Sequence, residues 1–404
     1  MRRIVVALLL VAGLIAAPSV AEAASPRVPG QVGLVSFIGA GTTSSGATLT
    51  IAWKGIPYAA KYDVIVSTSF SGVQKKQAVS LSTRRTSATL TRLRPGTAYF
   101  VQVRPVNSVG KWGLRSNRVG HVTISSQPSA AAQAAMSDYR VLSWNICTNA
   151  CGNFVGREPL ISSRLNELQA DIIGLQESDD YRTNLPGYAY AHSPGLNIMY
   201  KASRLSLVTS GGTRAEGRLI LFTASANRVG EGASWAALRD NLTGKYVVVF
   251  NTHLQTGKDA ASIHQREYEA NQLLRYMEQV KADLRTHFGG VTDWSTAPSV
   301  LIGDFNWSRT RASDSTGQIL TNAGWFDAFE QAQTLTNQHL NTGNPDLRTT
   351  PPIGITWGDH VDQIRVNPGT TAVTSWANAG KIAGGKYVAP LPSDHSPLLV
   401  GLKF

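Results

Sequence analysis

Four short apolar runs in the chain beyond residue 137 each lead into a polar residue. The runs cover residues 140–144, 172–175, 246–250 and 300–302, and the polar residues that follow them are Asn145, Glu177, His253 and Asp304. Short, continuous apolar runs are typical of strands that are buried on both faces. Ligands of such sheets bind where the strands end, so the sequence predicts a single rim at which these four polar side chains gather.

Residues 303–306 give the most specific sign of chemistry at this rim. Asp304 and Asn306 are two residues apart, and side chains at positions i and i+2 of a strand face the same side. A carboxylate can orient or deprotonate a water molecule while an amide donates a hydrogen bond to a phosphate oxygen, which suits hydrolysis of a phosphate ester. The competing interpretation is structural, because Asp and Asn also end strands as turn-forming residues.

Two later segments complete a set of six motifs. Residues 361–366 alternate like a strand and carry Asp362, while Asp394 and His395 precede the apolar run 398–400. In order and spacing, the set resembles the endonuclease/exonuclease/phosphatase superfamily, which includes deoxyribonuclease I. The motifs are Trp144-Asn145-Ile146, Leu175-Gln176-Glu177, Asn251-Thr252-His253-Leu254, Gly303-Asp304-Phe305-Asn306, Val361-Asp362-Gln363-Ile364 and Ser393-Asp394-His395-Ser396-Pro397. The resemblance covers essentially all of residues 138–404 and implies an α/β four-layer sandwich.

The resemblance also implies a role for each matching residue. Glu177 would be the principal carboxylate of a Mg²⁺ site, with Mn²⁺ as the alternative metal, and Asn145 and Asp394 would assist it. Asp304 would orient or deprotonate the attacking water, and His395, held by Asp362, would stabilise the charge that grows on the phosphate. Phosphate contacts are expected from Asn145, His253, Asn306 and His395, and catalytic roles from His253, Asp304, Asn306, Asp362 and His395. The division of acid and base roles among His253, His395 and Asp304 stays open, and the histidines at 192, 264, 287, 339 and 360 are expected to be structural.

Residues 26–125 have a different character, since they are dense in Thr, Val, Ser and Gly and contain short alternating segments separated by turn signals. This pattern predicts an all-β sandwich of roughly 100 residues. The segment resembles a fibronectin type III domain, with Trp53 in the place of its core tryptophan and residues 93–99 as its tyrosine corner. Tyr99 is therefore expected to be structural, with its hydroxyl bonded to a backbone group. The Ala-rich residues 126–137 predict a linker between this domain and the domain at 138–404.

The formal net charge of +12 lies entirely in the first domain. Between residues 26 and 126 there are thirteen Lys and Arg and a single acid, Asp63, whereas residues 127–404 carry 23 basic and 24 acidic residues. Such a module could hold the chain near a polyanion or a cell surface, and the contact would weaken with salt. A basic surface that only aids solubility is the alternative.

Residues 1–24 are expected to be a secretory signal peptide, because Arg2 and Arg3 precede a short apolar stretch and a small-residue cleavage site. No later segment is long and apolar enough to predict a transmembrane helix. In an oxidising compartment Cys147 and Cys151 favour a local disulfide over free thiols or metal ligation. The chain is thus predicted to be secreted and extracellular.

The leading prediction is a metal-dependent phosphoester hydrolase, specifically a phosphodiesterase or nuclease acting on extracellular nucleic acid. The alternatives are a sphingomyelinase-like phospholipid phosphodiesterase, a small-molecule phosphatase, and a polyanion-binding protein with an inactive phosphoesterase fold. A lipid enzyme would need an exposed apolar hairpin, for which residues 324–326 are the candidate. The sequence does not predict the oligomeric state.

Overall fold

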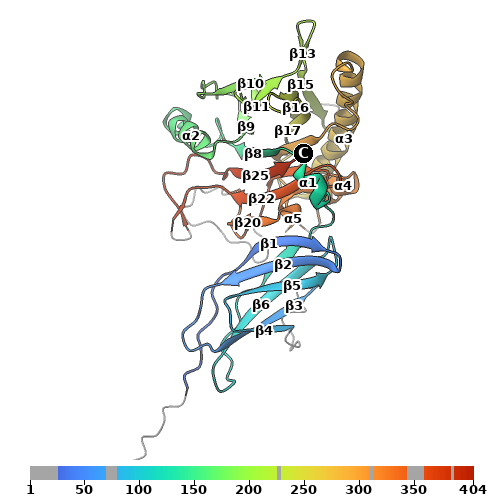
Figure 1. Cartoon of the computed structure of the whole chain (residues 1–404). Helices are drawn as coiled ribbons and strands as arrows, with labels where there is room; N and C mark the ends of the chain where they lie inside the picture. Colours follow the sequence, from blue (N-terminus) through green and yellow to red (C-terminus); the bar gives the residue numbers. More distant parts are fainter. Residues whose placement is uncertain are drawn as a thin grey trace, which may run out of the picture.

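The computed structural model describes residues 26–69, 80–224, 229–309, 311, 313–343, 359–383 and 386–404. The expected signal peptide at residues 1–24 lies outside the described residues. The described chain forms two domains that lie end to end, with the first domain below the second in Figure 1.

The first domain is a sandwich of two antiparallel sheets, as predicted. One sheet contains β1 (Val35–Thr43), β2 (Gly46–Trp53) and β5 (Ser87–Leu93), and the other contains β3 (Lys61–Ser67), β4 (Leu81–Thr83), β6 (Ala98–Val106) and β7 (Val119–Val122). In β2 buried and half-buried residues alternate along the whole strand, because one face packs on the opposite sheet. Trp53 is buried in this core, and the Tyr99 hydroxyl accepts a hydrogen bond of 3.0 Å from the Arg94 backbone N–H, which confirms the tyrosine corner.

The second domain contains two larger sheets that face each other. One contains β8 (Asp138–Asn145), β9 (Ile172–Ser178), β10 (Tyr188–His192), β11 (Gly195–Lys201), β20 (Thr334–Thr336), β22 (Ala372–Asn378) and β25 (Leu398–Lys403). The other contains β12 (Leu205–Leu207), β15 (Glu216–Phe222), β16 (Val229–Asp240), β17 (Tyr246–His253), β18 (Ser299–Asp304), β19 (Phe326–Asp327) and β21 (Asp362–Val366). Two small hairpins, β13 (Thr209–Ser210) with β14 (Thr213–Arg214) and β23 (Ile382–Ala383) with β24 (Lys386–Tyr387), lie outside them.

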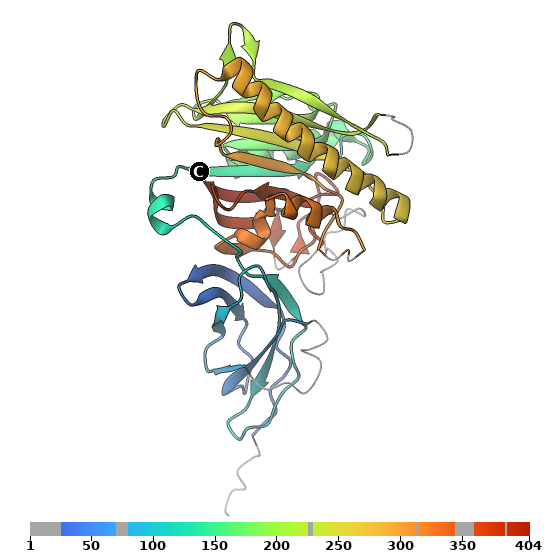
Figure 2. The ribbon, with the colours of Figure 1, turned by 90° about the vertical axis from the view of Figure 1, so that its right-hand side faces the viewer.

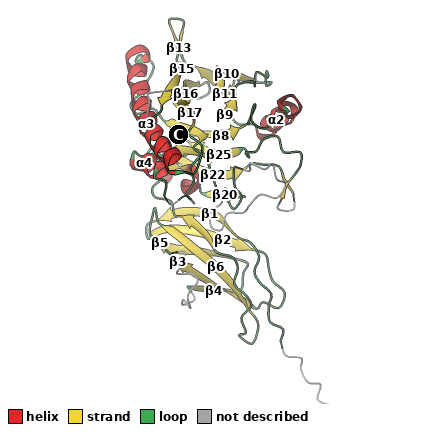
Figure 3. Ribbon diagram, turned by 180° about the vertical axis from the view of Figure 1, so that it is seen from behind, coloured by secondary structure: helices red, strands yellow, loops and turns green. Residues whose placement is uncertain are grey.

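Helices cover the outer faces of the two sheets and complete the four layers (Figures 1 and 3). Helix α2 (Phe154–Leu168) packs Ile161 and Leu165 on the β8 side chains Leu142 and Trp144, and α3 (Ala260–Phe288) runs across the other sheet (Figure 2). Helices α4 (Thr316–Asn322) and α5 (Ala328–Gln331) are shorter. Consecutive residues of β8 and β18 face opposite cores, so these strands are buried on both sides, as their apolar runs predict. The α/β four-layer sandwich is confirmed.

The two domains are joined through a shared sheet. Strand β1 of the first domain pairs antiparallel with β20 of the second at Gly39 and Thr334, and the Ala40 N–H donates to the Gln333 carbonyl at 2.9 Å. The order β22-β20-β1-β2-β5 thus continues one sheet across the domain boundary. Residues 126–137, predicted as a linker, contain helix α1 (Ala130–Ala134) and lie beside this junction. Backbone pairing of this kind fixes the relative orientation of the domains more firmly than a linker alone.

A cluster of aromatic rings fills the junction, and we call it the junction cluster: Phe37, His121, Phe329, His360 and Trp376. The His121 ring stacks on Phe329 with 4.6 Å between centroids, and His360 and Trp376 contact Phe329 edge-on at 4.7 and 5.2 Å. Both imidazoles are buried, and each leaves its Nε2 without a hydrogen-bond partner. Burial accordingly lowers the pKa of His121 to about 3 and that of His360 to about 4. His360 is therefore structural, as predicted.

The junction cluster makes the fold sensitive to acid. Because the unfolded chain binds a proton at His121 near pH 6.5 and the folded chain does so only near pH 3, stability is lost as pH falls below 6.5. The charged neighbour Arg309 and the second imidazole, His360, both oppose protonation of His121. Each pH unit across this window costs about 1.4 kcal/mol per histidine. Urea unfolding at pH 7.5 and pH 5 should therefore show a smaller loss of stability for His121→Leu than for the wild type.

The matched control is His264→Leu, since His264 is an exposed histidine on α3. Its stability difference between the two pH values should equal that of the wild type. An unchanged acid sensitivity in His121→Leu would show that the junction histidine stays hydrated or protonated in the folded protein.

Candidate active site

Strand register brings the predicted polar residues together at one rim. On the first sheet the parallel pair β8 and β9 places Asn145 opposite Gln176, next to Glu177. On the second sheet the parallel pair β17 and β18 places His253 opposite Asp304, and the antiparallel strand β21 places Asp362 on the other side of Asp304. Hydrogen bonds join the two groups across the gap between the sheets. The predicted rim is thus formed by the ends of neighbouring strands in two facing sheets.

Asn145 links the two sheets through its side-chain amide. The amide nitrogen donates to Glu177 Oε1 at 2.8 Å and to Asp304 Oδ2 at 3.2 Å, while its oxygen accepts from the Cys147 backbone N–H at 3.0 Å. The Cys147 N–H needs an acceptor, which fixes which end of the amide points at the carboxylates. In this arrangement Asn145 orients Glu177 and Asp304, and its oxygen, which accepts one hydrogen bond, keeps a second lone pair.

Asn306 and His253 form a second hydrogen-bonded pair. The Asn306 amide nitrogen donates to the Leu254 carbonyl at 3.0 Å and lies 3.1 Å from His253 Nε2. Because the carbonyl identifies this atom as the donor, His253 Nε2 is the acceptor and its ring proton lies on Nδ1. Both amide hydrogens of Asn306 are engaged, so its expected contact with a phosphate stays a prediction.

Asp304 lies at the centre of the rim. It is almost fully buried, and its Oδ1 accepts from the Asn306 backbone N–H at 2.8 Å. Its Oδ2 lies 3.6 Å from His253 Nε2 and 3.7 Å from His395 Nε2. A carboxylate held by backbone and amide donors between two imidazoles is suited to orient a water molecule between them.

His395 reaches the rim from the loop before β25 and is held by Asp362. Its Nδ1 lies 2.8 Å from Asp362 Oδ2, which directs Nε2 toward Asp304. Burial lowers the pKa of His395, but the charges of Asp362, Asp304 and Asp394 outweigh it and raise that pKa to about 10. Burial raises the pKa of Asp362, yet the pair keeps its proton on the imidazole because several carboxylates surround the ring. His395 is thus a hydrogen-bond donor at neutral pH.

Asp394 adds a further carboxylate beside this group. Burial raises its pKa, and the charges of Glu177 and Asp304 raise it further, which places the three acids within electrostatic reach of one another. Neither Glu177 nor Asp394 forms an ion pair with Lys or Arg in the described part of the chain. Oxygen ligands with an excess of negative charge are the donor set that a hard divalent cation requires.

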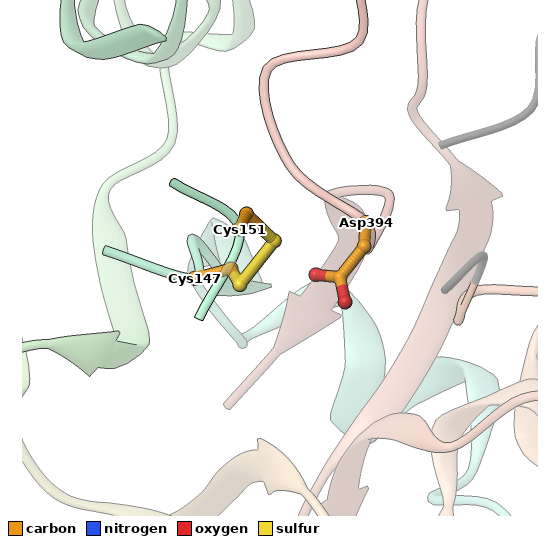
Figure 4. A group of neighbouring side chains, drawn as sticks. All are labelled: Cys147, Cys151 and Asp394. Carbon is orange, nitrogen blue, oxygen red and sulfur yellow. A yellow bond between two sulfur atoms is a disulfide. The ribbon is translucent and has the colours of Figure 1, made fainter. Parts of the chain in front are cut away.

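The predicted disulfide is present next to Asp394. Cys147 and Cys151 are bonded, and Figure 4 shows them on a loop that faces the loop of Asp394. Although both sulfur atoms and a carboxylate oxygen lie within 4.8 Å of one another, a disulfide offers no thiolate, so metal ligation by these cysteines is excluded. The disulfide instead fixes the turn that follows Asn145.

Arg157 is a structural contributor to the site that the sequence motifs do not predict. From helix α2 its guanidinium donates to the carbonyls of Ile146, Cys147 and Gly152 on the disulfide loop, and to Pro392 on the loop of Asp394 and His395. Five N–H donors in a planar fork suit this use of Arg as a clamp on carbonyl groups. The one sequence signal for this role of Arg157 is its position near the start of α2, ten residues after Cys147. Arg266 on helix α3 is fully buried and pairs with Asp314 at 2.6 Å.

Three residues of the site have left-handed backbone conformations without being glycine. Their φ angles are 46° at Glu177, 48° at Asn306 and 49° at Cys147. Such conformations cost on the order of 1 kcal/mol each and persist where surrounding contacts enforce them. Here they turn Glu177 and Asn306 toward the rim at the ends of β9 and β18, at the cost of local strain.

These features agree with the comparison of the chain with protein families. The model of the Endonuclease/Exonuclease/phosphatase family matches residues 142–395, and that of the fibronectin type III domain matches residues 32–122. The chain belongs to the endonuclease/exonuclease/phosphatase family, with a fibronectin type III domain preceding the catalytic one. Members of this family are phosphoester hydrolases that typically depend on a divalent metal.

Solved structures similar to this chain include a phosphatase, Nocturnin and TDP2. A mannosyl-6-phosphatase from Bacteroides thetaiotaomicron is 22% identical, with 66% of this chain and 100% of that chain covered and a TM-score of 0.49. The catalytic domain of human Nocturnin is 18% identical, with 67% and 97% covered and a TM-score of 0.45. TDP2 from D. rerio, complexed with single-strand DNA product, is 16% identical, with 66% and 99% covered and a TM-score of 0.46. No curated protein matches the chain.

Proposed function

We propose that this protein is a secreted, divalent-metal-dependent phosphodiesterase that acts on extracellular nucleic acid. The observation that carries the proposal is the convergence of Glu177, Asp304, His253 and the His395–Asp362 pair at one rim. This set supplies oxygen ligands for a cation, a carboxylate to orient water and a charged donor for a phosphate oxygen.

Each group has a proposed role in the reaction. Glu177 and Asp394 would hold the cation, which is Mg²⁺ or Mn²⁺ and would polarise the phosphate and neutralise its charge. Asn145 keeps Glu177 in place for this, and its oxygen would assist as a ligand through its second lone pair. Asp304 orients the attacking water, and His395 donates its Nε2 proton to a non-bridging phosphate oxygen. His253, positioned by Asn306, lies where it can contact the phosphate or the leaving oxygen.

Secretion rests on the sequence of residues 1–24 and is supported by the disulfide, since disulfides persist in oxidising compartments. None of the helices in the described part of the chain combines the length and hydropathy that crossing a bilayer requires. Sequencing the N-terminus of protein recovered from the growth medium tests this part, because secretion predicts a mature chain that begins close to Ser25. Retention in the cell with Met1 in place would contradict it.

Basic residues outnumber acidic ones by twelve in the first domain, which favours work close to a polyanion, either a nucleic acid or an anionic lipid surface. Residues 324–326, the hairpin expected for a phospholipid enzyme, are not exposed in this way, since Trp325 is buried and Phe326 of β19 pairs with Val366 of β21. The phosphodiesterase assignment itself rests on the rim and does not depend on either observation.

The test is a substrate panel with purified protein and Mg²⁺. It compares bis-p-nitrophenyl phosphate, p-nitrophenyl phosphate, single- and double-stranded DNA, RNA and sphingomyelin, each with and without EDTA. The expected result is EDTA-sensitive hydrolysis of the diester and of at least one nucleic acid. Hydrolysis of the monoester alone would favour a phosphatase, hydrolysis of sphingomyelin alone a lipid enzyme, and no hydrolysis a binding protein.

A further inference from the structure

The end of the first domain that lies away from the catalytic domain gathers basic and exposed apolar side chains. We call this end the distal tip and define it as residues 26–30, 54–61, 84–86 and 107–115. Strand register shows that these segments are neighbours, because Lys61 pairs with Val106, Tyr62 pairs with Thr83, and the Trp53 N–H donates to the Thr86 carbonyl. In Figures 1 and 2 the N-terminal segment and the loop after β6 both lie at the bottom, opposite the second domain.

The distal tip carries a concentrated positive charge. Its exposed basic side chains are Arg27, Lys54, Lys61, Arg84, Arg85 and Lys111. The sole acid of the first domain, Asp63, is buried and already faces Lys61 and Arg104 at 3.9 and 3.7 Å. The charge of the tip is therefore not balanced locally, and it favours a negatively charged partner.

Apolar side chains project from the same tip. Val109, Trp112 and Leu114 are 57%, 58% and 71% exposed on the loop after β6, and Tyr58 is 57% exposed on the neighbouring turn. The tip also holds Val28, so five of the exposed large apolar side chains in the described chain lie here. Guanidinium groups cover one face of two rings, with Arg104 3.9 Å above Trp112 and Arg27 5.5 Å from Tyr58. Such exposure within one small region is unusual for a surface that meets only water.

The loop is held rigidly in this exposed form. Buried Asn107 accepts from the N–H groups of Val109 and Lys111 and donates to the carbonyls of Pro26 and Arg27. Tyr58 has a left-handed φ of 66°, a strained conformation for an aromatic residue that keeps its ring outward. Preorganised apolar residues lose little conformational entropy when a partner covers them.

We propose that the distal tip binds the surface of an anionic lipid membrane. Trp and Leu side chains at a convex end can enter the interface between headgroups and acyl chains, while the surrounding Lys and Arg contact acidic headgroups. A nucleic acid would use the charges and the rings, but it offers no environment for the aliphatic side chains of Val109 and Leu114. Single-stranded nucleic acids are also bound in grooves, whereas these loops form the end of a sandwich.

The shared sheet at the domain junction gives this contact a structural consequence. Because β1 continues the catalytic sheet through β20, binding at the tip would hold the catalytic domain at a fixed orientation above the membrane. This role is independent of the proposed phosphodiesterase activity, since no residue of the tip belongs to the rim.

The test is co-sedimentation of the full protein with vesicles in EDTA, which prevents hydrolysis. Vesicles contain phosphatidylcholine alone or phosphatidylcholine with phosphatidylglycerol, at low and high salt. We expect binding to the anionic vesicles that weakens with salt, and little binding to phosphatidylcholine alone. Arg84→Ser with Arg85→Ser, and separately Trp112→Ser with Leu114→Ser, should each weaken partitioning about tenfold or more.

Matched controls lie on the catalytic domain. Arg275→Ser with Arg285→Ser removes two exposed charges from α3, and Leu242→Ser removes a side chain that is 72% exposed in the turn before β17. Both controls should bind anionic vesicles like the wild type. If the charge control weakens binding as much as the tip variants do, the effect depends on net charge alone and the proposal is overturned. The proposal is also overturned if both tip variants bind anionic vesicles like the wild type.

A third arm separates lipid from nucleic acid. If the tip variants lose affinity for a fluorescent single-stranded oligonucleotide while no protein binds vesicles, the partner is a nucleic acid and the lipid proposal is wrong. Unchanged thermal midpoints of the tip variants exclude unfolding as the cause. Because all binding is measured in EDTA, failure here leaves the hydrolysis assays of the proposed function unaffected.

Discussion

The Asp304→Asn variant is expected to hydrolyse phosphodiesters with a kcat/KM about 10³-fold below that of the wild type, the typical contribution of a group that acts on the attacking water. Asparagine can still accept from the Asn306 N–H, so the loop after β18 keeps its anchor. Its second atom, however, would be an amide nitrogen placed 3.2 Å from the amide nitrogen of Asn145 and close to two imidazoles. The site would therefore lose both the negative charge and the acceptor at Oδ2.

The measurement is kcat/KM for bis-p-nitrophenyl phosphate at saturating Mg²⁺, together with the urea midpoint of each protein. Asp283→Asn, at an exposed position on α3, is the matched control and should retain full activity. If Asp304→Asn stays within tenfold of the wild type while folded, the carboxylate does not act on water, and the proposed mechanism is wrong at its centre.

The Glu177→Gln variant is expected to lose metal affinity as well as activity. Glutamine has the size of glutamate and keeps an acceptor for the Asn145 amide, but it removes the charge that a hard cation requires. We expect the dissociation constant for Mn²⁺ to rise by at least about 100-fold and kcat/KM at fixed metal to fall by about 10³-fold or more, since the metal contributes several kcal/mol to the transition state. In the wild type, EDTA should abolish hydrolysis and added Mg²⁺ should restore it.

Calorimetric titration with Mn²⁺ measures the dissociation constant of the metal without relying on turnover. Glu278→Gln on the exposed face of α3 serves as the control and should bind Mn²⁺ like the wild type. Unchanged Mn²⁺ affinity in Glu177→Gln would move the cation to other ligands, even if activity were lost.

The strand ends of the site could be predicted from the sequence because backbone periodicity fixes them. A short apolar run that is buried on both faces is followed by polar residues where the strand ends, which places Asn145, His253 and Asp304 at strand termini. Parallel pairing then aligns those termini, as the register of His253 with Asp304 shows. The family motifs added Asp362 and His395, whose direct contact at 2.8 Å agrees with the predicted pairing.

The orientation of individual polar groups could not be predicted in the same way. The metal contact expected of Asn145 and the phosphate contact expected of Asn306 stay predictions, and each amide is also held by a backbone group near it in the chain. An amide has a donor end and an acceptor end, and which end faces the site depends on neighbours such as the Cys147 N–H that only the folded loop supplies. Arg157 was missed for a related reason, since its partners are carbonyls that carry no signature in the sequence.

The contact between the two domains could not be predicted from the sequence either. Composition separates a basic sandwich from a nearly neutral catalytic domain and predicts a linker between them. In addition to that connection, the structure continues a catalytic sheet into the sandwich through β20 and β1 and fills the junction with rings from both domains. An edge strand presents unpaired N–H and C=O groups to any partner, so its pairing is decided by proximity in space and not by its own side chains.

By itself, the sequence determined the two domain types, the strands that carry the rim and the chemical identity of the groups at it, because these follow from periodicity and residue type. Only the tertiary structure decided how the amides are turned, that His395 lies among several carboxylates that hold its proton, and that the two domains share a sheet. Those properties depend on distances between residues far apart in the chain, where burial strengthens each electrostatic and hydrogen-bonding contact and so selects one arrangement.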